Sequence, residues 1–265
     1  MDIILDEFIW SFSRVSSFSQ CPQSFYLDYI TQEDSENNVF GEYGSLCHVV
    51  LEDWAKGHLA EFQMENKYIE AFSTQITKPF PPNKYVNLQE KYYSQGLDYF
   101  NNFTGIQGEI IGVENKYYFN VGKYKFTGFI DLETTNKIID HKSKSKLDKK
   151  RIAKKNSHKH VQMTDGRYIE KKEFYQLYIY SIPYKEKHGF YPKKLALNMF
   201  KIQDWYEIDF TEEGLAEATA YIVETIEEIY QTKVFLKGKD VGAFWCEHVC
   251  GQKFNCKYSS LYLED

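Results

Sequence analysis

The chain has 265 residues, 43% of them hydrophobic and 26% charged, which is enough for one soluble domain with a sizeable core. Its formal net charge of −6 shows that it is not a strongly basic protein, so the overall charge does not indicate a nucleic-acid partner. No apolar run approaches the roughly 20 residues that a membrane span needs, and the acidic N-terminus is unlike a signal peptide. We therefore expect a cytoplasmic protein in a reducing compartment, without a membrane partner.

The first hundred residues are predicted to be mainly helical. Apolar residues at helical spacing favour three helices, with connections at the polar stretch 31–38 and at the proline-containing stretch 78–84. The three are a helix capped by Ser16 that continues to Ile30, a helix over Gly44–Phe62 and a helix over Leu88–Phe103.

Short β-type runs follow, and they alternate with helices. The strands are expected at Ile110–Phe119, Lys123–Leu132, Lys137–Lys142, Lys194–Lys201 and Trp205–Phe210. The polar and basic stretch from Ser143 to about Arg167 predicts a long loop or a partly disordered insertion. A helix over Glu170–Lys187 should stop at or shortly after Pro183, and Thr211 should cap a long helix that reaches Tyr230.

Two carboxylates and one amine occur at the ends of neighbouring predicted strands. Asp131 ends one strand, and Asp140-x-Lys142 ends the next. Side chains two apart on a strand share a face, so Asp140, Lys142 and an inward Asp131 can converge. Carboxylates hold one or two Mg²⁺ or Mn²⁺ ions, which activate water, and an ammonium group can orient that water or stabilise negative charge. The competing interpretation is three solvated residues near a turn.

The order of several motifs resembles that of RecB-like nucleases of the PD-(D/E)XK superfamily. Those motifs are Glu114, Gly128-x-x-Asp131, Asp140-x-Lys142 and Gln176-x-x-x-Tyr180, preceded by Gly44-x-x-x-His48. The resemblance implies an α/β fold with a restriction-endonuclease-like core, in which helices flank a central mixed sheet. It also implies that His48, Asp131, Asp140 and Glu114 ligate metal, that Lys142 assists the water, and that Gln176 and Tyr180 position substrate. Glu114 is equally compatible with a place on the strand surface.

Three features depart from that family pattern. The proline of the superfamily's name is absent before Asp131, and His141 stands where an apolar residue is more usual. The helix that bears Gln176 begins unusually far after Lys142, and the basic stretch Ser143–Lys172 fills the gap. This insertion could grip the DNA backbone or gate the site, or it could be a solvated loop.

Four of the five cysteines lie near the two ends of the chain. Cys21 is upstream, and Cys246, Cys250 and Cys256 follow the predicted nuclease core. This arrangement resembles the iron–sulfur staple of AddB-type nucleases and of related CRISPR-adaptation nucleases, which implies a 4Fe–4S cluster on these four residues. Zinc, held by the four thiolates or by three of them with His248, is the alternative, and unliganded thiols are another. Cys47 is expected to be a small buried residue.

We therefore expect a single nuclease domain over 1–265, with a helical part at 1–108, a catalytic core at 109–210 and a cluster-binding segment at 211–265. The expected activity is exonucleolytic hydrolysis of DNA ends, with single-stranded DNA as a partner and a helicase or recombination protein as another. Recombination and repair, phage replication and CRISPR adaptation are the candidate pathways. The alternatives are a non-catalytic module that binds DNA ends or a partner, and a zinc-stapled protein-interaction domain.

Overall fold

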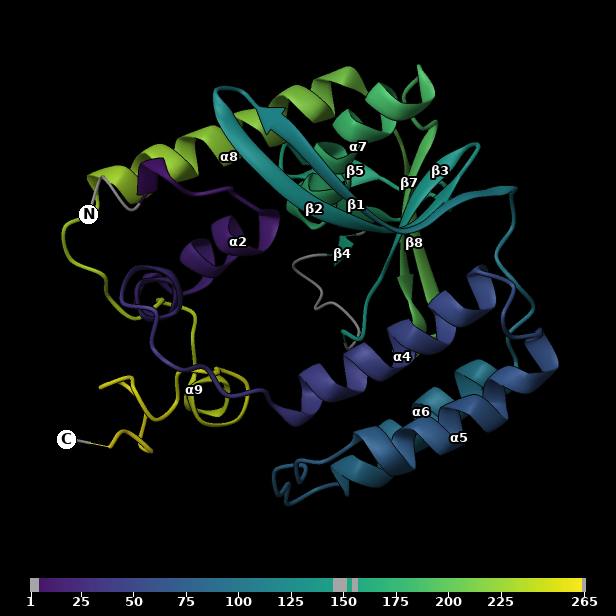
Figure 1. Ribbon diagram of the computed structural model, residues 1–265, viewed down its shortest axis with the longest axis horizontal. Helices are drawn as coiled ribbons and strands as arrows, with labels where there is room; N and C mark the ends of the chain where they lie inside the picture. The colour runs from purple at the N-terminus through teal and green to yellow at the C-terminus, as the bar shows by residue number, and fades with distance from the viewer. Residues whose placement is uncertain (1–4, 145–151, 154–156, 264–265) are drawn as a thin grey trace. The chain divides into compact units, whose positions relative to one another are not determined.

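The computed structural model describes residues 5–144, 152–153 and 157–263 (Figure 1). The helices of the described part are α2 Phe12–Gln20, α3 Pro22–Phe25, η1 Tyr26–Ile30, α4 Val39–Ala55, η2 Glu61–Gln63, α5 Met64–Gln75, α6 Leu88–Asn101, η3 Lys171–Phe174, α7 Tyr175–His188, η4 Phe200–Ile202, α8 Glu212–Gln231 and α9 Ala243–His248. The strands are β1 Ile110–Val121, β2 Tyr124–Thr134, β3 Lys137–His141, β4 Ile152–Ala153, β5 His160–Gln162, β6 Tyr168–Glu170, β7 Lys194–Met199 and β8 Asp204–Asp209.

The chain divides into two compact units that interleave along the sequence. One unit contains residues 1–41, 118–127 and 219–265, and the other contains residues 42–117 and 128–218. These units differ from the three consecutive segments expected from the sequence, and the single-domain assignment stays a prediction.

A mixed five-stranded sheet has the order β1-β2-β3-β7-β8, and most of its residues belong to the second unit. Strand β3 pairs antiparallel with β2 and parallel with β7, and β7 pairs antiparallel with β8. Parallel neighbours need a long crossover connection, and here it includes α7, which packs on β3 and β7. The parallel pair is buried, as the apolar run of β7 predicts.

Helices α4, α5 and α6 share a hydrophobic core in this second unit (Figure 1). Their apolar faces enclose a core in which aromatic rings pack edge-to-face, for example Tyr43 against Tyr92 at 4.9 Å. The buried members of this core are Tyr43, Leu46, Cys47, Val50, Leu51, Met64, Tyr68, Ala71, Phe72, Tyr99, Phe100 and Phe200. Ala55 of α4 packs on the sheet residues Leu132, Ile139 and Ala196, so α4 is fixed against the face of the sheet.

The other unit joins the two ends of the chain. Trp10 bridges Phe126 near the β1–β2 turn, and its backbone N–H donates to the Lys125 carbonyl at 2.8 Å. The 27–36 segment is bound to the C-terminal segment, because Gln252 donates to Asp28 at 2.7 Å and the Glu36 N–H donates to the Gly251 carbonyl at 3.0 Å. No helix in the described part of the chain is both long and apolar enough to cross a membrane.

Several expected elements need correction. Ser11, not Ser16, caps the first helix, since its hydroxyl accepts the Arg14 N–H at 3.3 Å. The second helix is Val39–Ala55 instead of Gly44–Phe62, and helix α5 was missed altogether. Helix α7 begins at Tyr175 instead of Glu170, and it ends at His188, next to the expected end at Lys187, with Pro183 inside the helix.

The basic stretch 143–167 is not simply a loop. Its described residues include β4 and β5, which together with β6 form a small three-stranded sheet. In the register of this sheet, Ile169 of β6 stands opposite Val161 of β5 and Ile152 of β4. The segments 145–151 and 154–156 of this insertion lie outside the described residues.

Candidate active site

Strands β2 and β3 separate next to Asp131 and Asp140, and we call this place the fork. Leu132 stands opposite Ile139 in the antiparallel register, and the next residues along the two strands are Asp131 and Asp140. There the Asp131 carboxylate accepts the His141 backbone N–H at 2.7 Å, in the place of a strand carbonyl. The fork between the strands therefore positions one of the two carboxylates by a backbone contact.

The two carboxyl groups influence each other electrostatically. Burial, followed by the negative charge of Asp140, raises the pKa of Asp131 well above its usual value. Asp140 is only 4% exposed. Two poorly hydrated carboxylates that repel one another are stabilised by a proton or by a cation, which makes this position suited to a divalent ion.

Lys142 lies against the second carboxylate, as the Asp-x-Lys spacing predicts. Its ammonium group is 2.6 Å from the Asp140 carboxylate and donates to Gln176 Oε1 at 3.0 Å. Burial alone would lower the pKa of Lys142, but the charge and hydrogen bond of Asp140, together with the charges of Asp131 and Glu173, outweigh burial and raise it above the usual value. Lys142 is therefore a cation in this arrangement, fixed by one partner on β3 and one on α7.

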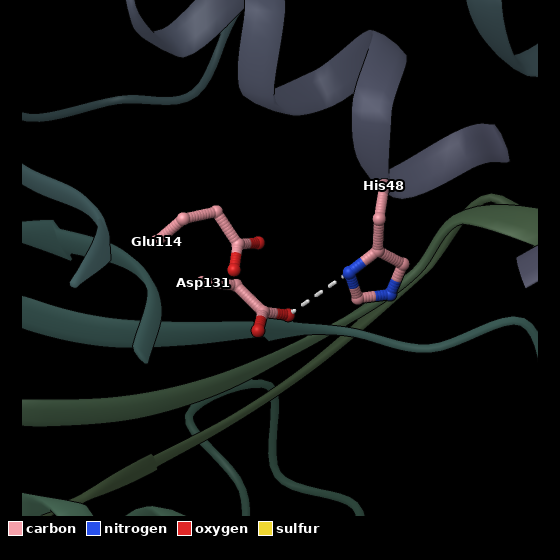
Figure 2. A group of neighbouring side chains, drawn as sticks. All are labelled: His48, Glu114 and Asp131. Atoms are coloured by element: carbon pink, nitrogen blue, oxygen red, sulfur yellow. Dashed lines mark ion pairs between the residues drawn. The ribbon is translucent and has the colours of Figure 1, made fainter. Parts of the chain in front are cut away.

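His48 approaches the same fork from α4. Its Nε2 lies 2.9 Å from the His141 carbonyl, which can only accept, so Nε2 carries the proton. The unprotonated Nδ1 then faces the Asp131 carboxylate at 3.6 Å (Figure 2). Burial lowers the pKa of His48, which keeps the ring neutral and its lone pair available. This is how a backbone carbonyl orients a metal-ligating histidine.

Glu114 reaches the group through an irregular backbone. It has a φ of 50° within β1, in the left-handed region that costs a non-glycine residue about 1–3 kcal/mol. Its carboxylate lies beside Asp131 (Figure 2), and ligand atoms of His48, Glu114 and Asp131 all lie within 4.8 Å of one another. Burial, followed by the charge of Glu52, raises the pKa of Glu114. Glu114 therefore lies beside Asp131 and not on the solvated surface of the strand.

The helix α7 brings the remaining expected residues to the same fork. Gln176 contacts Lys142, and Tyr180 packs over Gly128, where an added Cβ would lie 2.5 Å from the Tyr180 ring. The glycine of Gly-x-x-Asp is therefore required by close approach of the tyrosine, not by backbone conformation. Tyr180 is 6% exposed, and burial raises its pKa, so it is a neutral hydroxyl.

A family model described as the PD-(D/E)XK nuclease superfamily matches residues 9–259. The chain belongs to the PD-(D/E)XK nuclease superfamily. Its mixed sheet with flanking helices is the restriction-endonuclease-like fold of that family. Membership makes the protein a hydrolytic nuclease, for which the family implies DNA as substrate and divalent metal ions as cofactors.

One similar solved structure is a protein described as a "Putative exonuclease" from Eubacterium rectale. It is 12% identical, the match covers 88% of this chain and 85% of that chain, and the TM-score is 0.47. At this level of similarity, the neighbour adds nothing to what the family match establishes. No curated protein matches the sequence.

The histidine that departs from the PD-(D/E)XK motif has a structural explanation. His141 is 6% exposed, and its Nδ1 accepts from the Asn198 amide at 3.0 Å. Burial lowers its pKa well below the usual value, so the ring stays neutral. His141 therefore replaces an apolar side chain in the core, while its backbone carbonyl and N–H contact His48 and Asp131.

The four cysteines of the expected cluster all lie in the unit that joins the chain ends. Cys21, Cys246, Cys250 and Cys256 are each at most 9% exposed. Burial raises the pKa of the Cys256 thiol, and the nearby Cys21 and Cys246 raise it further. The Gly238 N–H lies 3.4 Å from the Cys21 sulfur and can donate to it. Residues far apart in sequence thus place their sulfurs near one another, and Cys47 lies elsewhere, fully buried in the helical core.

Two acidic residues near the fork were not expected from the sequence. Glu52 lies one helical turn after His48, and that spacing of four is the signal that places both on one face. Glu133 is fully buried and accepts from Asn115, Tyr117 and His188. Nothing in the sequence reveals the Glu133 contacts, because they come from β1 and from the end of α7.

We expect the stabilisation by Mn²⁺ to grow with pH. The raised pKa values of Asp131 and Glu114 mean that the metal-free protein loses stability as pH rises through them, because the folded state holds their protons more tightly than the unfolded chain. Mn²⁺ bound at these carboxylates would compete with those protons, so it should bind more tightly at pH 8 than at pH 5.5. The melting temperature with and without Mn²⁺ measures the effect, at about 2–4 °C per kcal/mol. An equal shift at both pH values, or the same pH dependence in Asp131→Asn, would contradict this expectation.

Proposed function

We propose that this PD-(D/E)XK nuclease is a Mg²⁺- or Mn²⁺-dependent DNA exonuclease of the RecB-like, AddB-type group. The observation that supports it is the convergence of ligand atoms from His48, Glu114 and Asp131 within 4.8 Å, beside the Asp140–Lys142 ion pair. One neutral imidazole and two carboxylates form a donor set that suits Mg²⁺ or Mn²⁺. The donor set therefore fits the cofactor that the family implies.

The roles of the residues follow from their contacts. A divalent ion at this position would polarise the phosphate and lower the pKa of a bound water. His48, Glu114 and Asp131 would hold that ion, and the nearby Asp140 carboxylate would add negative charge. Because the acidic groups around Lys142 raise its pKa, its ammonium group acts mainly as a fixed cation that orients water and stabilises charge on the phosphate.

Residues of α7 complete the site. Gln176 accepts from Lys142 and so holds the ammonium group toward Asp140. Tyr180, a buried neutral hydroxyl against Gly128, positions substrate as a hydrogen-bond donor. Both side chains lie on one face of α7 because they are four residues apart.

Cleavage of end-labelled DNA tests the activity and its polarity. Wild-type protein with Mn²⁺ should shorten single-stranded and double-stranded oligonucleotides from their ends, and Asp140→Ala should fail to do so. A 5′ and a 3′ label distinguish the direction, and a circular substrate distinguishes exonuclease from endonuclease activity. Binding of DNA without cleavage by wild-type protein would instead favour the non-catalytic module.

The cellular role follows by analogy with the same group. We propose a cytoplasmic enzyme that acts on DNA ends in recombination or repair, phage replication or CRISPR adaptation, with a helicase or recombination protein as partner. In the basic insertion, Lys159 is exposed next to the start of β5, where it can contact the phosphate backbone.

We also propose that Cys21, Cys246, Cys250 and Cys256 hold a 4Fe–4S cluster. Four buried thiols from the two ends of the chain suit a cluster that fastens those ends together. Anaerobically purified protein should be brown, with iron and sulfide present, and Cys250→Ser should lose the colour. Stoichiometric zinc in colourless protein would show that zinc occupies the thiols instead.

A further inference from the structure

Phe129 is a large apolar residue that folding leaves half exposed beside the candidate active site. Its side chain is 50% exposed, although it stands between Gly128 and Ile130, both of which face the core. Exposed aromatic residues occur elsewhere in this chain, so exposure alone has no significance. The position of Phe129 on β2, two residues before Asp131, is what distinguishes it.

Phe129 and Asp131 lie on the same side of the sheet. Gly128 and Ile130 face the other side, where Tyr180 covers Gly128. Residues two apart on an extended strand are separated by roughly 7 Å. The exposed ring therefore lies within the span of one nucleotide from the group formed by His48, Glu114 and Asp131, which is itself partly exposed.

A cation adjoins the ring from the neighbouring strand. The Lys116 ammonium group is 5.6 Å from the centre of the Phe129 ring, and Lys116 follows Glu114 by two residues on β1. The two strands of this hairpin thus present an aromatic ring and an ammonium group next to the acidic group. A nucleotide has the complementary parts, which are a flat base and charged phosphates.

We propose that Phe129 stacks on an unpaired nucleobase of single-stranded DNA while Lys116 binds an adjacent phosphate. This inference rests on the proposed nuclease function, and it names the substrate class and the residue that selects it. A base in a duplex is covered on both faces by its neighbours, whereas a base in a single strand can leave its neighbours to stack on a ring. The nucleotide held in this way has its phosphate directed to the residues that ligate the metal ion.

The test is a binding titration with a single-stranded oligonucleotide that contains the fluorescent base 2-aminopurine, with Mn²⁺ present and in the Lys142→Ala background to slow cleavage. Stacking should quench the fluorescence. Phe129→Ala should lose the quenching and weaken binding by about tenfold, as expected for one stacked base. Phe129→Trp should retain both properties, and Phe129→Leu should resemble Phe129→Ala.

Two controls separate stacking from a structural effect. Phe62→Ala removes a phenylalanine that is 83% exposed on η2, and it should leave binding unchanged. A blunt duplex of the same length should bind Phe129→Ala and the parent protein equally. Equal binding of the single strand by Phe129→Ala and its parent would overturn the proposal, as would an equal loss on the duplex or full rescue by leucine.

The experiment distinguishes failure of the stacking proposal from failure of the nuclease proposal. If the wild-type protein does not cleave DNA, the same titration is done in the wild-type background, and quenching that depends on Phe129 would still support stacking. If the wild-type protein cleaves single-stranded DNA but Phe129→Ala leaves KM unchanged, the nuclease stands and the stacking proposal is wrong. Absence of any quenching in either background overturns the proposal as well.

Discussion

Lys142→Ala should lower the rate of DNA cleavage by about 10³-fold, within the range found for a group that assists proton transfer or stabilises charge. The ammonium group is held by the Asp140 carboxylate at 2.6 Å and by Gln176 at 3.0 Å, so its removal takes a fixed positive charge from the site. The measurement is single-turnover cleavage of an end-labelled oligonucleotide at saturating Mn²⁺.

The stability of this variant needs separate attention. Removing Lys142 leaves the buried Asp140 without its cation and next to Asp131, which should destabilise the metal-free protein. Mn²⁺ neutralises the same carboxylates, so the variant should recover much of its melting temperature when the ion is added. A lost rate with a recovered melting temperature assigns the defect to the reaction and not to folding.

Two substitutions provide the matched comparison. Lys144→Ala removes a lysine that is two residues away, half exposed and paired with Glu173 at 3.4 Å, and cleavage should change by less than about twofold. Lys142→Arg keeps the charge but changes the shape, so it should keep more activity than Lys142→Ala if charge is the main contribution. Wild-type rates in Lys142→Ala would contradict the role proposed for this residue.

The linear order of motifs predicts much of the arrangement at the fork. Asp140 and Lys142 interact as the two-residue period of a strand requires, and Gln176 and Tyr180 share one face of α7 as the four-residue spacing requires. Local periodicity is enough for these residues because each pair lies within one element. Family resemblance was needed to bring the separate elements together.

The parts that could not be predicted depend on contacts between distant elements. Nothing in the strand sequence indicates the left-handed backbone of Glu114. The apolar residues of α5 that pack in the helical core are separated by polar residues, so the sequence pattern did not indicate a helix there. The paired strands in the basic insertion could not be predicted because their polar sequence lacks an alternating apolar pattern, and because they pair with β6, a separate segment of the chain.

The second large effect is expected from substitution of Glu133, which should lower the stability of the protein. Its carboxylate is fully buried and accepts from Tyr117 at 2.6 Å, Asn115 at 2.7 Å and His188 at 2.7 Å, with the Lys187 ammonium group 3.6 Å away. Burial alone would raise the pKa of Glu133, but these donors outweigh it and lower the pKa below its usual value. The charged carboxylate thus joins β1, β2 and the end of α7.

Glu133→Ala should therefore lower the free energy of unfolding by about 3–5 kcal/mol, because it leaves several buried donors without an acceptor. Urea denaturation measures the loss, and Glu207→Ala is the matched control. Glu207 likewise has two basic partners, Lys137 and Lys194, but its side chain is 16% exposed. Its removal should therefore lower the free energy of unfolding by about 1 kcal/mol or less. Equal losses in the two variants would show that burial of the Glu133 network contributes nothing.

The pH dependence gives this network a distinct signature. A carboxyl whose folded pKa is lowered stabilises the protein above its unfolded pKa, and the stabilisation is lost as pH falls through the folded value. Glu133→Gln, which keeps the shape but not the charge, should flatten the loss of stability in acid. Glu133 accepts a hydrogen bond from Asn115, which directly follows the strained backbone of Glu114, so Glu133→Gln should also weaken Mn²⁺ binding. An unchanged Mn²⁺ affinity would show that Glu133 is not needed to hold the Glu114 backbone in place.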